Sequence, residues 1–268
     1  ILFDCGEGTQ VNWRLSGWSF RPTGTILLSH LHADHIAGLP GVLFQIAHAG
    51  RTEPVTIYGP EQTAEIVTHL VRIVGRLPYE LRVVHLEGGD SIPIVAGLTL
   101  STLRLRHRMP CIGYRLDLPR ARRFDPDRAR ERGVPMHEWS RLQAGEVVNG
   151  VDPADVLGPQ RRGLRVSLIT DTSYVEEIVP FVDSSDLLIC ESMYGTDDKR
   201  EEAERRGHMT ARQAAGIGAS ANVKSLWLTH FSPAVTDLDE LAGVARAVCP
   251  DAEVGYPGLM MTMRFDDE

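Results

Sequence analysis

Residues 28–43 read LSHLHADHIAGLPGVL and carry the strongest signal in this chain. They begin inside an apolar run over residues 25–29, which has the composition of a β-strand. Just past this run, four potential metal ligands fall within six residues: His30, His32, Asp34 and His35. Imidazole nitrogens and carboxylate oxygens bind Zn²⁺, Mn²⁺ and similar divalent ions. Two alternating histidines on an extended turn can face one ion, which leaves the next two ligands for a second ion.

Further ligands must come from elsewhere, because one short loop cannot complete two coordination shells. Three side chains are each the first metal-capable residue after a strand-like run: His107 after 98–105, Asp171 after 166–170 and His230 after 226–229. In layered α/β proteins, ligands gather at the carboxyl ends of strands. Together with the first motif, these residues fit a hydrolase whose two metal ions activate a bridging water and stabilise a transferring phosphoryl group.

Strands alternate with helices along most of the chain. We expect strands at residues 1–3, 25–29, 55–58, 81–86, 98–105, 166–170, 187–190 and 226–229, and helices at 36–48, 61–74, 208–221 and 236–248. Strands interleaved with helices predict a layered α/β protein. We find no internal repeat and no linker between two domains, so we expect one domain over residues 1–268.

The composition excludes several classes of protein. Hydrophobic residues make up 43% and charged residues 24%, which indicates a globular core and excludes a disordered chain. No run approaches the ~18 to 20 apolar residues of a membrane-spanning helix. The net charge of −8 excludes a chain that coats nucleic acid over its whole surface, although it permits a local basic patch. The four cysteines form no C-x-x-C pair, and we see no signal-peptide pattern, so a cytoplasmic location is the expectation.

Residues 119–163 differ from the rest because they are rich in Arg, Pro and Gly. From Arg104 to Arg165 the chain has 14 Arg and no Lys against 8 Asp and Glu, a balance of +6 within a chain of −8. One interpretation is a solvated loop with charge pairs, since Asp125 and Asp127 lie among the arginines. The other is an arm that contacts phosphates. The charge pattern alone favours neither.

The order of these motifs resembles that of the ribonuclease Z family, the tRNA 3′ endonucleases of the metallo-β-lactamase superfamily. The resemblance covers nearly the whole chain. The matching stretches are FDCGEGTQ (3–10), LSHLHADHIAGLPGVL (28–43), TIYGP (56–60), HRMPCIGYRL (107–116), FDPDRARERGVP (124–135), DVLGP (155–159), TDT (170–172), HMTARQAA (208–215) and LTHFSP (228–233).

The resemblance implies the metallo-β-lactamase fold, a four-layer αβ/βα sandwich of two mixed sheets with the metals at one edge. Residues 119–163 would be a protruding, substrate-binding arm inserted in a single hydrolase domain. The family also has strands before FDCGEGTQ, so we expect this chain to lack the first strands of the fold.

The resemblance also implies two Zn²⁺ ions per subunit, with Mn²⁺ or another divalent ion as the alternative. The implied metal ligands are His30, His32 and His107 for the first ion and Asp34, His35 and His230 for the second, with Asp171 bridging both. Two residues would be catalytic. Asp34 would orient the attacking water or accept its proton, and His208 would protonate the leaving 3′ oxygen. The helix predicted from residue 208 would favour an anionic phosphate beside His208.

Two carboxylates are expected to support the site. Glu191 follows its strand as Asp171 does, and we expect it to orient His208 through a hydrogen bond. Asp4 is expected to hydrogen-bond a ligating histidine, because metal sites commonly fix their ligands in this way. Thr170 stands where the family commonly has a glycine before the bridging aspartate.

The function implied by the resemblance is removal of the 3′ trailer from precursor tRNA by metal-activated water attack. The family also implies a homodimer in which one subunit's arm serves the other's site; no membrane partner is expected. Residues 136–140 lack the Gly-Pro-rich arm tip usual in the family. This departure keeps a second hypothesis open, a dinuclear-metal phosphodiesterase or other hydrolase of a small molecule. A third is a non-catalytic RNA-binding relative, against which the complete ligand set argues.

Overall fold

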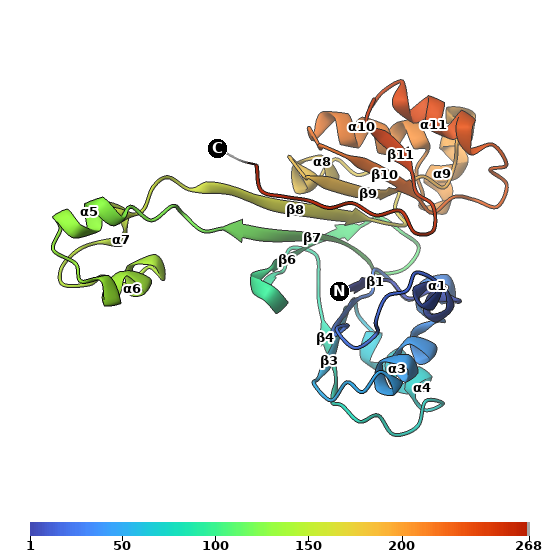
Figure 1. Cartoon of the computed structure of the whole chain (residues 1–268). Coiled ribbons are helices and arrows are strands. Elements are labelled where there is room, and N and C mark those ends of the chain that lie inside the picture. The colour runs from blue at the N-terminus through green and yellow to red at the C-terminus, as the bar shows by residue number, and fades with distance from the viewer. Residues whose placement is uncertain (267–268) are drawn as a thin grey trace. The chain divides into compact units, whose positions relative to one another are not determined.

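The computed structural model describes residues 1–266 of the 268 (Figure 1). Two compact units make up the chain. The larger unit comprises residues 1–116 and 165–262, and the smaller one comprises residues 117–164 with the segment that begins at residue 263. No helix among residues 1–266 is long and apolar enough to cross a membrane.

The first sheet of the larger unit has four strands in the order β1-β2-β3-β4. These are β1 (Leu2–Phe3), β2 (Thr25–Leu27), β3 (Val55–Gly59) and β4 (Leu81–His85). The helices between them are α1 (Thr9–Leu15), α2 (Ala33–Ile36), α3 (Leu39–His48) and α4 (Thr63–Val71). Every strand pair in this sheet is parallel, so the prediction of two mixed sheets was wrong for this one. The reason is that each strand returns through a helical crossover, which joins parallel neighbours.

The second sheet has seven strands in the order β11-β10-β9-β8-β7-β6-β5. Its strands are β5 (Ser91–Pro93), β6 (Thr99–Leu105), β7 (Cys111–Arg120), β8 (Arg161–Ile169), β9 (Leu187–Glu191), β10 (Leu226–Thr229) and β11 (Ala252–Val254). Its helices are α8 (Ile178–Val182), α9 (Arg200–Arg206), α10 (Ala211–Ser220) and α11 (Leu238–Arg246), with short 3₁₀ turns η1 (Val95–Gly97) and η3 (Asp197–Lys199). This sheet is mixed, because β5 and β6 are antiparallel whereas β8 to β11 are parallel.

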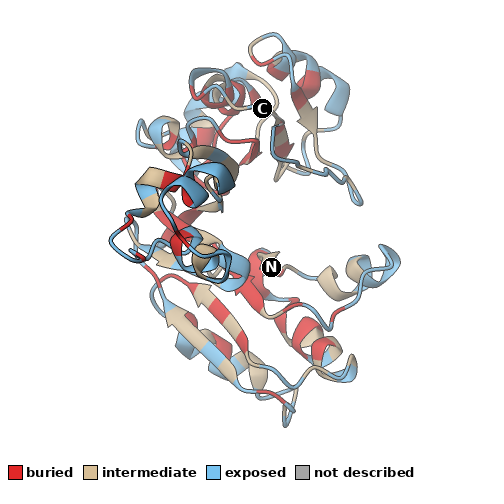
Figure 2. Cartoon of the chain, turned by 60° about the vertical axis from the view of Figure 1, so that its left-hand side comes forward, coloured by how far each residue is buried: buried red, intermediate tan, exposed pale blue. Residues whose placement is uncertain are grey.

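Alternation along buried strands explains how the layers form. Ile26 points into a core shared with α3 and α4, whereas Leu27 next to it joins a core between the sheets. That central core also contains Leu100, Tyr114 and Leu168 of the second sheet, which therefore packs face to face against the first. Figure 2 shows buried positions along both the strands and the helices. Successive strand side chains face opposite sides, so a strand buried on both faces supplies both cores. The layers run helix, sheet, sheet, helix, which confirms the predicted sandwich.

The smaller unit contains more regular structure than its sequence indicated. It holds α5 (Pro126–Glu131), η2 (Met136–Glu138), α6 (Trp139–Gln143) and α7 (Pro153–Val156). The side chain of Asp125 caps α5 by accepting from the backbone N–H groups of Asp127 and Arg128. The unit has its own small core, which includes Ala129, Leu142, Val148 and Val156 with Phe124 and Trp139 packed against it. Several arginines do form the charge pairs considered above: Arg128–Asp125, Arg130–Asp127 and Arg132–Asp155.

The start of α10 differs from the prediction. The helix begins at Ala211, because Thr210 and Gln213 form a capping box in which each side chain bonds the other's backbone N–H. His208 therefore lies before the cap and not at the first turn of the helix. The expectation that a helix N-terminus would act directly at His208 was wrong for this reason.

Candidate metal centre

The HLHADH motif, residues 30–35, follows strand β2 and extends into helix α2. His30 follows the strand in a fully buried position, and His32 is the extended residue just before α2. The short helix then carries Asp34 and His35 into the same region. His35 is 6% exposed, whereas the side chain of Asp34 is 62% exposed, so the motif spans from the interior to solvent.

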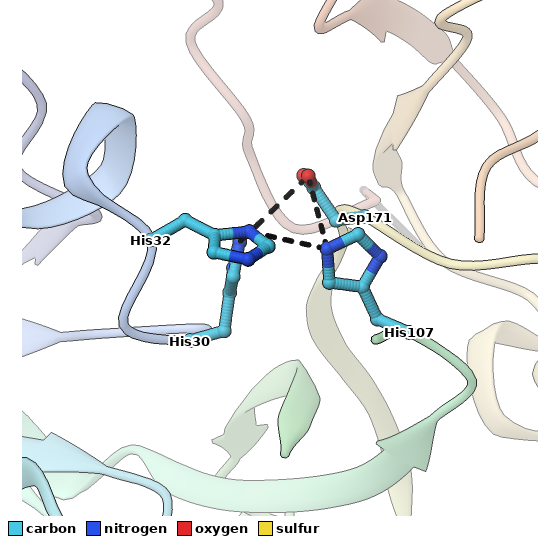
Figure 3. Close-up of side chains that lie close together, drawn as sticks. All are labelled: His30, His32, His107 and Asp171. Carbon is cyan, nitrogen blue, oxygen red and sulfur yellow. Dashed lines mark hydrogen bonds and ion pairs between the residues drawn. The ribbon is translucent and has the colours of Figure 1, made fainter. Parts of the chain in front are cut away.

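One group of donors consists of three histidines and an aspartate from three separate segments (Figure 3). His30 Nε2 lies 3.0 Å from His32 Nδ1, which in turn lies 3.2 Å from His107 Nε2. The carboxylate oxygen Oδ2 of Asp171 lies 3.7 Å from His30 Nε2 and 3.8 Å from His107 Nε2. Each of the four residues can therefore offer one ligand atom to a single ion.

A second group adjoins the first. His35 Nε2 lies 3.3 Å from His230 Nε2 and 3.5 Å from Asp34 Oδ2. Asp171 faces this group with its other oxygen, because Oδ1 lies 3.4 Å from His35 Nε2 and 3.3 Å from His230 Nε2. Asp171 thus presents one carboxylate oxygen to each group, which is the geometry that a bridging ligand requires.

The protonation pattern of the histidines fits bound cations. His107 Nδ1 donates to the carbonyl of Gly207 at 3.0 Å, and His35 Nδ1 donates to Asp4 Oδ2 at 2.7 Å. In a neutral imidazole, a proton on one nitrogen leaves a lone pair on the other. The Nε2 lone pairs of both rings therefore point into the centre. A proton on His32 Nδ1 could satisfy only one of its two imidazole neighbours, whereas a divalent ion satisfies several donors at once.

Burial supports the neutral form of the first group. Burial lowers the pKa of His30 to about 2, with His35 adding to the effect. Burial likewise lowers the pKa of His107. For Asp171, burial acts to raise the pKa, but His230, His35, His30 and the Thr170 hydroxyl together lower it to about 2. His30 and His107 thus stand as neutral imidazoles beside an ionised carboxylate, the forms in which both act as metal ligands.

Asp4 is hydrogen-bonded to one histidine of each donor group, directly to His35 and through Ser29 to His30. Its carboxylate accepts from the backbone N–H of Ser29 at 2.7 Å and from the Ser29 hydroxyl at 2.7 Å, besides the bond from His35. The Ser29 oxygen lies 2.9 Å from His30 Nδ1 and, having given its own proton to Asp4, accepts from that nitrogen. The predicted hydrogen bond between Asp4 and a centre histidine is present.

His208 lies beside the centre and is held by Glu191. Its Nδ1 is 3.1 Å from Glu191 Oε1 and 4.0 Å from Asp171 Oδ2. Glu191 is fully buried and also accepts from the backbone N–H groups of Thr172 and Met209. The predicted Glu191–His208 hydrogen bond is therefore present. Burial by itself would lower the pKa of His208, but Glu191 and Asp171 raise it above its usual value.

His230 adopts a conformation that fits a functional role. It follows β10 with a positive φ of 58°, a region that residues other than glycine rarely occupy. Its buried Nδ1 has no hydrogen-bond partner among the described residues. Such strain, about 1 to 3 kcal/mol, is typical of functional sites where surrounding structure fixes the backbone.

Sequence reasoning missed three supporting groups. The Ser29 hydroxyl links Asp4 to His30, and the Thr170 hydroxyl donates to Asp171 Oδ1 at 2.8 Å. Neither residue belongs to the metal-binding residue types, although both adjoin a motif ligand in the sequence. The third group, the carbonyl of Gly207, is backbone and leaves no side-chain signal.

Comparisons with known proteins give the family. Residues 1–127 match the family model for the beta-lactamase superfamily domain. Ribonuclease Z of Lachnoclostridium phytofermentans is 38% identical over 270 residues, which cover 99% of this chain and 89% of that protein. Ribonuclease Z of Clostridium kluyveri is 40% identical over 272 residues, covering 100% of this chain and 90% of that protein. The chain belongs to the ribonuclease Z family. This confirms the family expected from the motifs and, with it, the class of metal-dependent hydrolases of the endoribonuclease type.

Solved structures agree on the fold. The crystal structure of human tRNase Z, short form, has a TM-score of 0.67 at 22% identity and covers 98% of this chain and 88% of that one. The metallo-beta-lactamase fold protein YhfI of Bacillus subtilis also has a TM-score of 0.67, at 20% identity, and covers 96% of this chain and 85% of that one. At these identities the likeness shows the metallo-β-lactamase fold.

Proposed function

We propose that this protein is a zinc-dependent endoribonuclease that removes the 3′ trailer from precursor tRNA. The observation that carries the proposal is the pair of donor groups that share Asp171, with His208 beside them. Membership of the ribonuclease Z family supports the substrate, because the relatives that match nearly the whole chain bear that name.

The residues at the centre fit two divalent ions. His30, His32 and His107 would hold one, Asp34, His35 and His230 the other, and Asp171 both. When bound, such ions supply an activated water and offset the negative charge that develops on a phosphoryl group. The donor set of imidazoles and carboxylates suits Zn²⁺, and Mn²⁺ is the nearest alternative.

Two side chains would move the protons. Asp34 has the exposed carboxylate of the centre and can accept a proton from an attacking water, which it can pass to solvent. His208 uses Nδ1 for Glu191, so Nε2 is the nitrogen left to donate a proton to the leaving 3′ oxygen. The raised pKa of His208 favours the protonated ring that this role needs.

Residues 119–163 would bind the body of the tRNA. Within this unit, Arg122, Arg123, Arg128 and Arg161 line a cavity of about 540 Å³. Arginines recognise phosphates independently of base sequence, which suits a substrate recognised by its shape. A homodimer in the cytoplasm, in which the arm of one subunit serves the centre of the other, completes the proposal.

The test is incubation of the zinc-loaded protein with a 3′-extended precursor tRNA, followed by mapping of both product ends. Cleavage next to the discriminator base that leaves a 3′-hydroxyl, and its loss in His32→Ala, would support the proposal. Hydrolysis of an aryl phosphodiester by the wild type without any cleavage of precursor tRNA would replace it with a hydrolase of small phosphodiesters.

A further inference from the structure

Three arginines lie next to the metal centre and outside residues 119–163. Arg104 and Arg106 occupy alternate positions at the end of β6, and Arg108 follows in the bend just past His107. All three are exposed. Alternate residues of an extended chain face the same side, about 6.6 Å apart. The sequence thus places a short row of positive charges that leads up to a metal-centre histidine.

The backbone that carries this row is fixed, whereas the charges are free. Arg106 pairs with Ser173 in an antiparallel bridge, and its N–H donates to the Thr172 hydroxyl at 2.9 Å. Among the described residues, the guanidinium groups of Arg104, Arg106 and Arg108 make no ion pair or hydrogen bond. Several arginines of the smaller unit, by contrast, are paired with carboxylates. A polyanion can therefore bind these unpaired arginines without first breaking other ion pairs.

A groove of about 830 Å³ runs along this strand and reaches His107. Arg104 and Arg106 line it, together with Thr102 and Phe181. Glu177 is the one carboxylate among the lining residues, and it is exposed. The groove is therefore net positive along its wall and ends at the segment that carries His107, which suits a path for a strand of nucleic acid.

Arg108, the last arginine of the row, lies within electrostatic reach of His208. The rings of His107 and His208 have centroids 5.2 Å apart, and His107 also bonds the carbonyl of the residue before His208. The positive charge of Arg108 reaches His208, where it acts against the larger effects of Glu191 and Asp171 on the pKa. If His208 protonates the leaving 3′ oxygen, then the side with His208 receives the nucleotide that keeps that oxygen. That nucleotide is the last one of the mature tRNA.

We propose that Arg104, Arg106 and Arg108 bind the phosphates of the acceptor strand on the 5′ side of the scissile bond. The groove along β6 then holds the 3′ end of the tRNA in line with the centre, and the trailer leaves on the other side. This inference rests on the proposed function and adds a substrate-binding track to it.

The test compares the double variant Arg104→Gln/Arg106→Gln with Arg72→Gln/Arg76→Gln. The control pair is also exposed and removes the same charge, but it lies at and just past the end of α4. Steady-state cleavage is measured on precursor tRNAs with a trailer of one nucleotide and with a long trailer, over a range of salt concentrations. Hydrolysis of an aryl phosphodiester reports whether the metal centre is intact.

The β6 variant should raise KM about 100-fold for both trailers, because each arginine replaced removes a charge-assisted hydrogen bond to a phosphate, which is worth about tenfold. Its salt dependence should flatten by about 1.4 in log–log slope, or about 0.7 for each phosphate of the single strand that is no longer neutralised. The β6 variant should hydrolyse the aryl phosphodiester at the wild-type rate. The control variant should cleave precursor tRNA with the wild-type KM. Equal KM values for the two variants would overturn the track, and a rise in KM seen only with the long trailer would overturn its 5′ placement. If the wild type fails to cleave precursor tRNA while it hydrolyses the aryl ester, the proposed function itself fails.

Discussion

Replacing Asp4 with alanine should weaken one metal site more than the other. The change removes an acceptor that holds His35 directly at 2.7 Å but reaches His30 only through Ser29. Loss of such an outer hydrogen bond typically lowers metal affinity by about 10- to 100-fold. This corresponds to about 1.4 to 2.7 kcal/mol. We expect that loss at the site of Asp34, His35 and His230 and a smaller one at the site of His30.

The assay is calorimetric titration of the metal-free protein with Zn²⁺ in the presence of a competing chelator. Asp4→Asn, which keeps one acceptor oxygen, should give an intermediate result. Asp152→Ala is the matched control, because Asp152 also accepts from a backbone N–H, that of Ala154 at 2.7 Å, but lies at the start of α7. Unchanged affinity at the site of Asp34, His35 and His230, or an equal loss at both sites, would show that Asp4 does not hold His35 as the hydrogen bonds indicate.

Three further predictions concern His208 and the helix that follows it. Glu191→Gln removes the negative charge that raises the pKa of His208, so the ring loses its proton at lower pH. The alkaline limb of the pH–rate profile should therefore move to lower pH. An unmoved limb would count against the Glu191–His208 pair. His208→Ala should slow precursor tRNA cleavage by about 10²- to 10⁴-fold but affect a p-nitrophenyl phosphodiester far less, because p-nitrophenolate leaves without a proton; equal losses would argue against His208 as the acid. Thr210→Ala removes the capping box of α10 and should lower the free energy of unfolding by about 1 kcal/mol in urea titrations, while an unchanged midpoint would show that the cap contributes nothing.

The donor residues of the centre could be identified from the sequence for a physical reason. His107, Asp171 and His230 each follow a strand, and strand ends converge at one edge of an α/β sandwich. The position of a residue just after a strand therefore indicates which side chains lie close together in the fold. The hydrogen bonds of Asp4 and Glu191 were predictable on the same basis, because Asp4 follows β1 and Glu191 is the last residue of β9.

Other features left weaker signals. The helices α5, α6 and α7 have only six, five and four residues, too few for a helical period to stand out. Strand direction in the first sheet depends on where each crossover returns, which strand composition does not reveal. The helix predicted from residue 208 begins only at Ala211, because Thr210 is its N-cap residue and has an extended backbone.

The claim on which the rest depends is that two ions share Asp171. Crystals of the zinc-loaded protein, measured at wavelengths on either side of the zinc absorption edge, test it directly. We expect two anomalous peaks, one among His30, His32 and His107 and one among Asp34, His35 and His230, with a carboxylate oxygen of Asp171 next to each. A single peak, or two peaks of which only one lies beside Asp171, would contradict it.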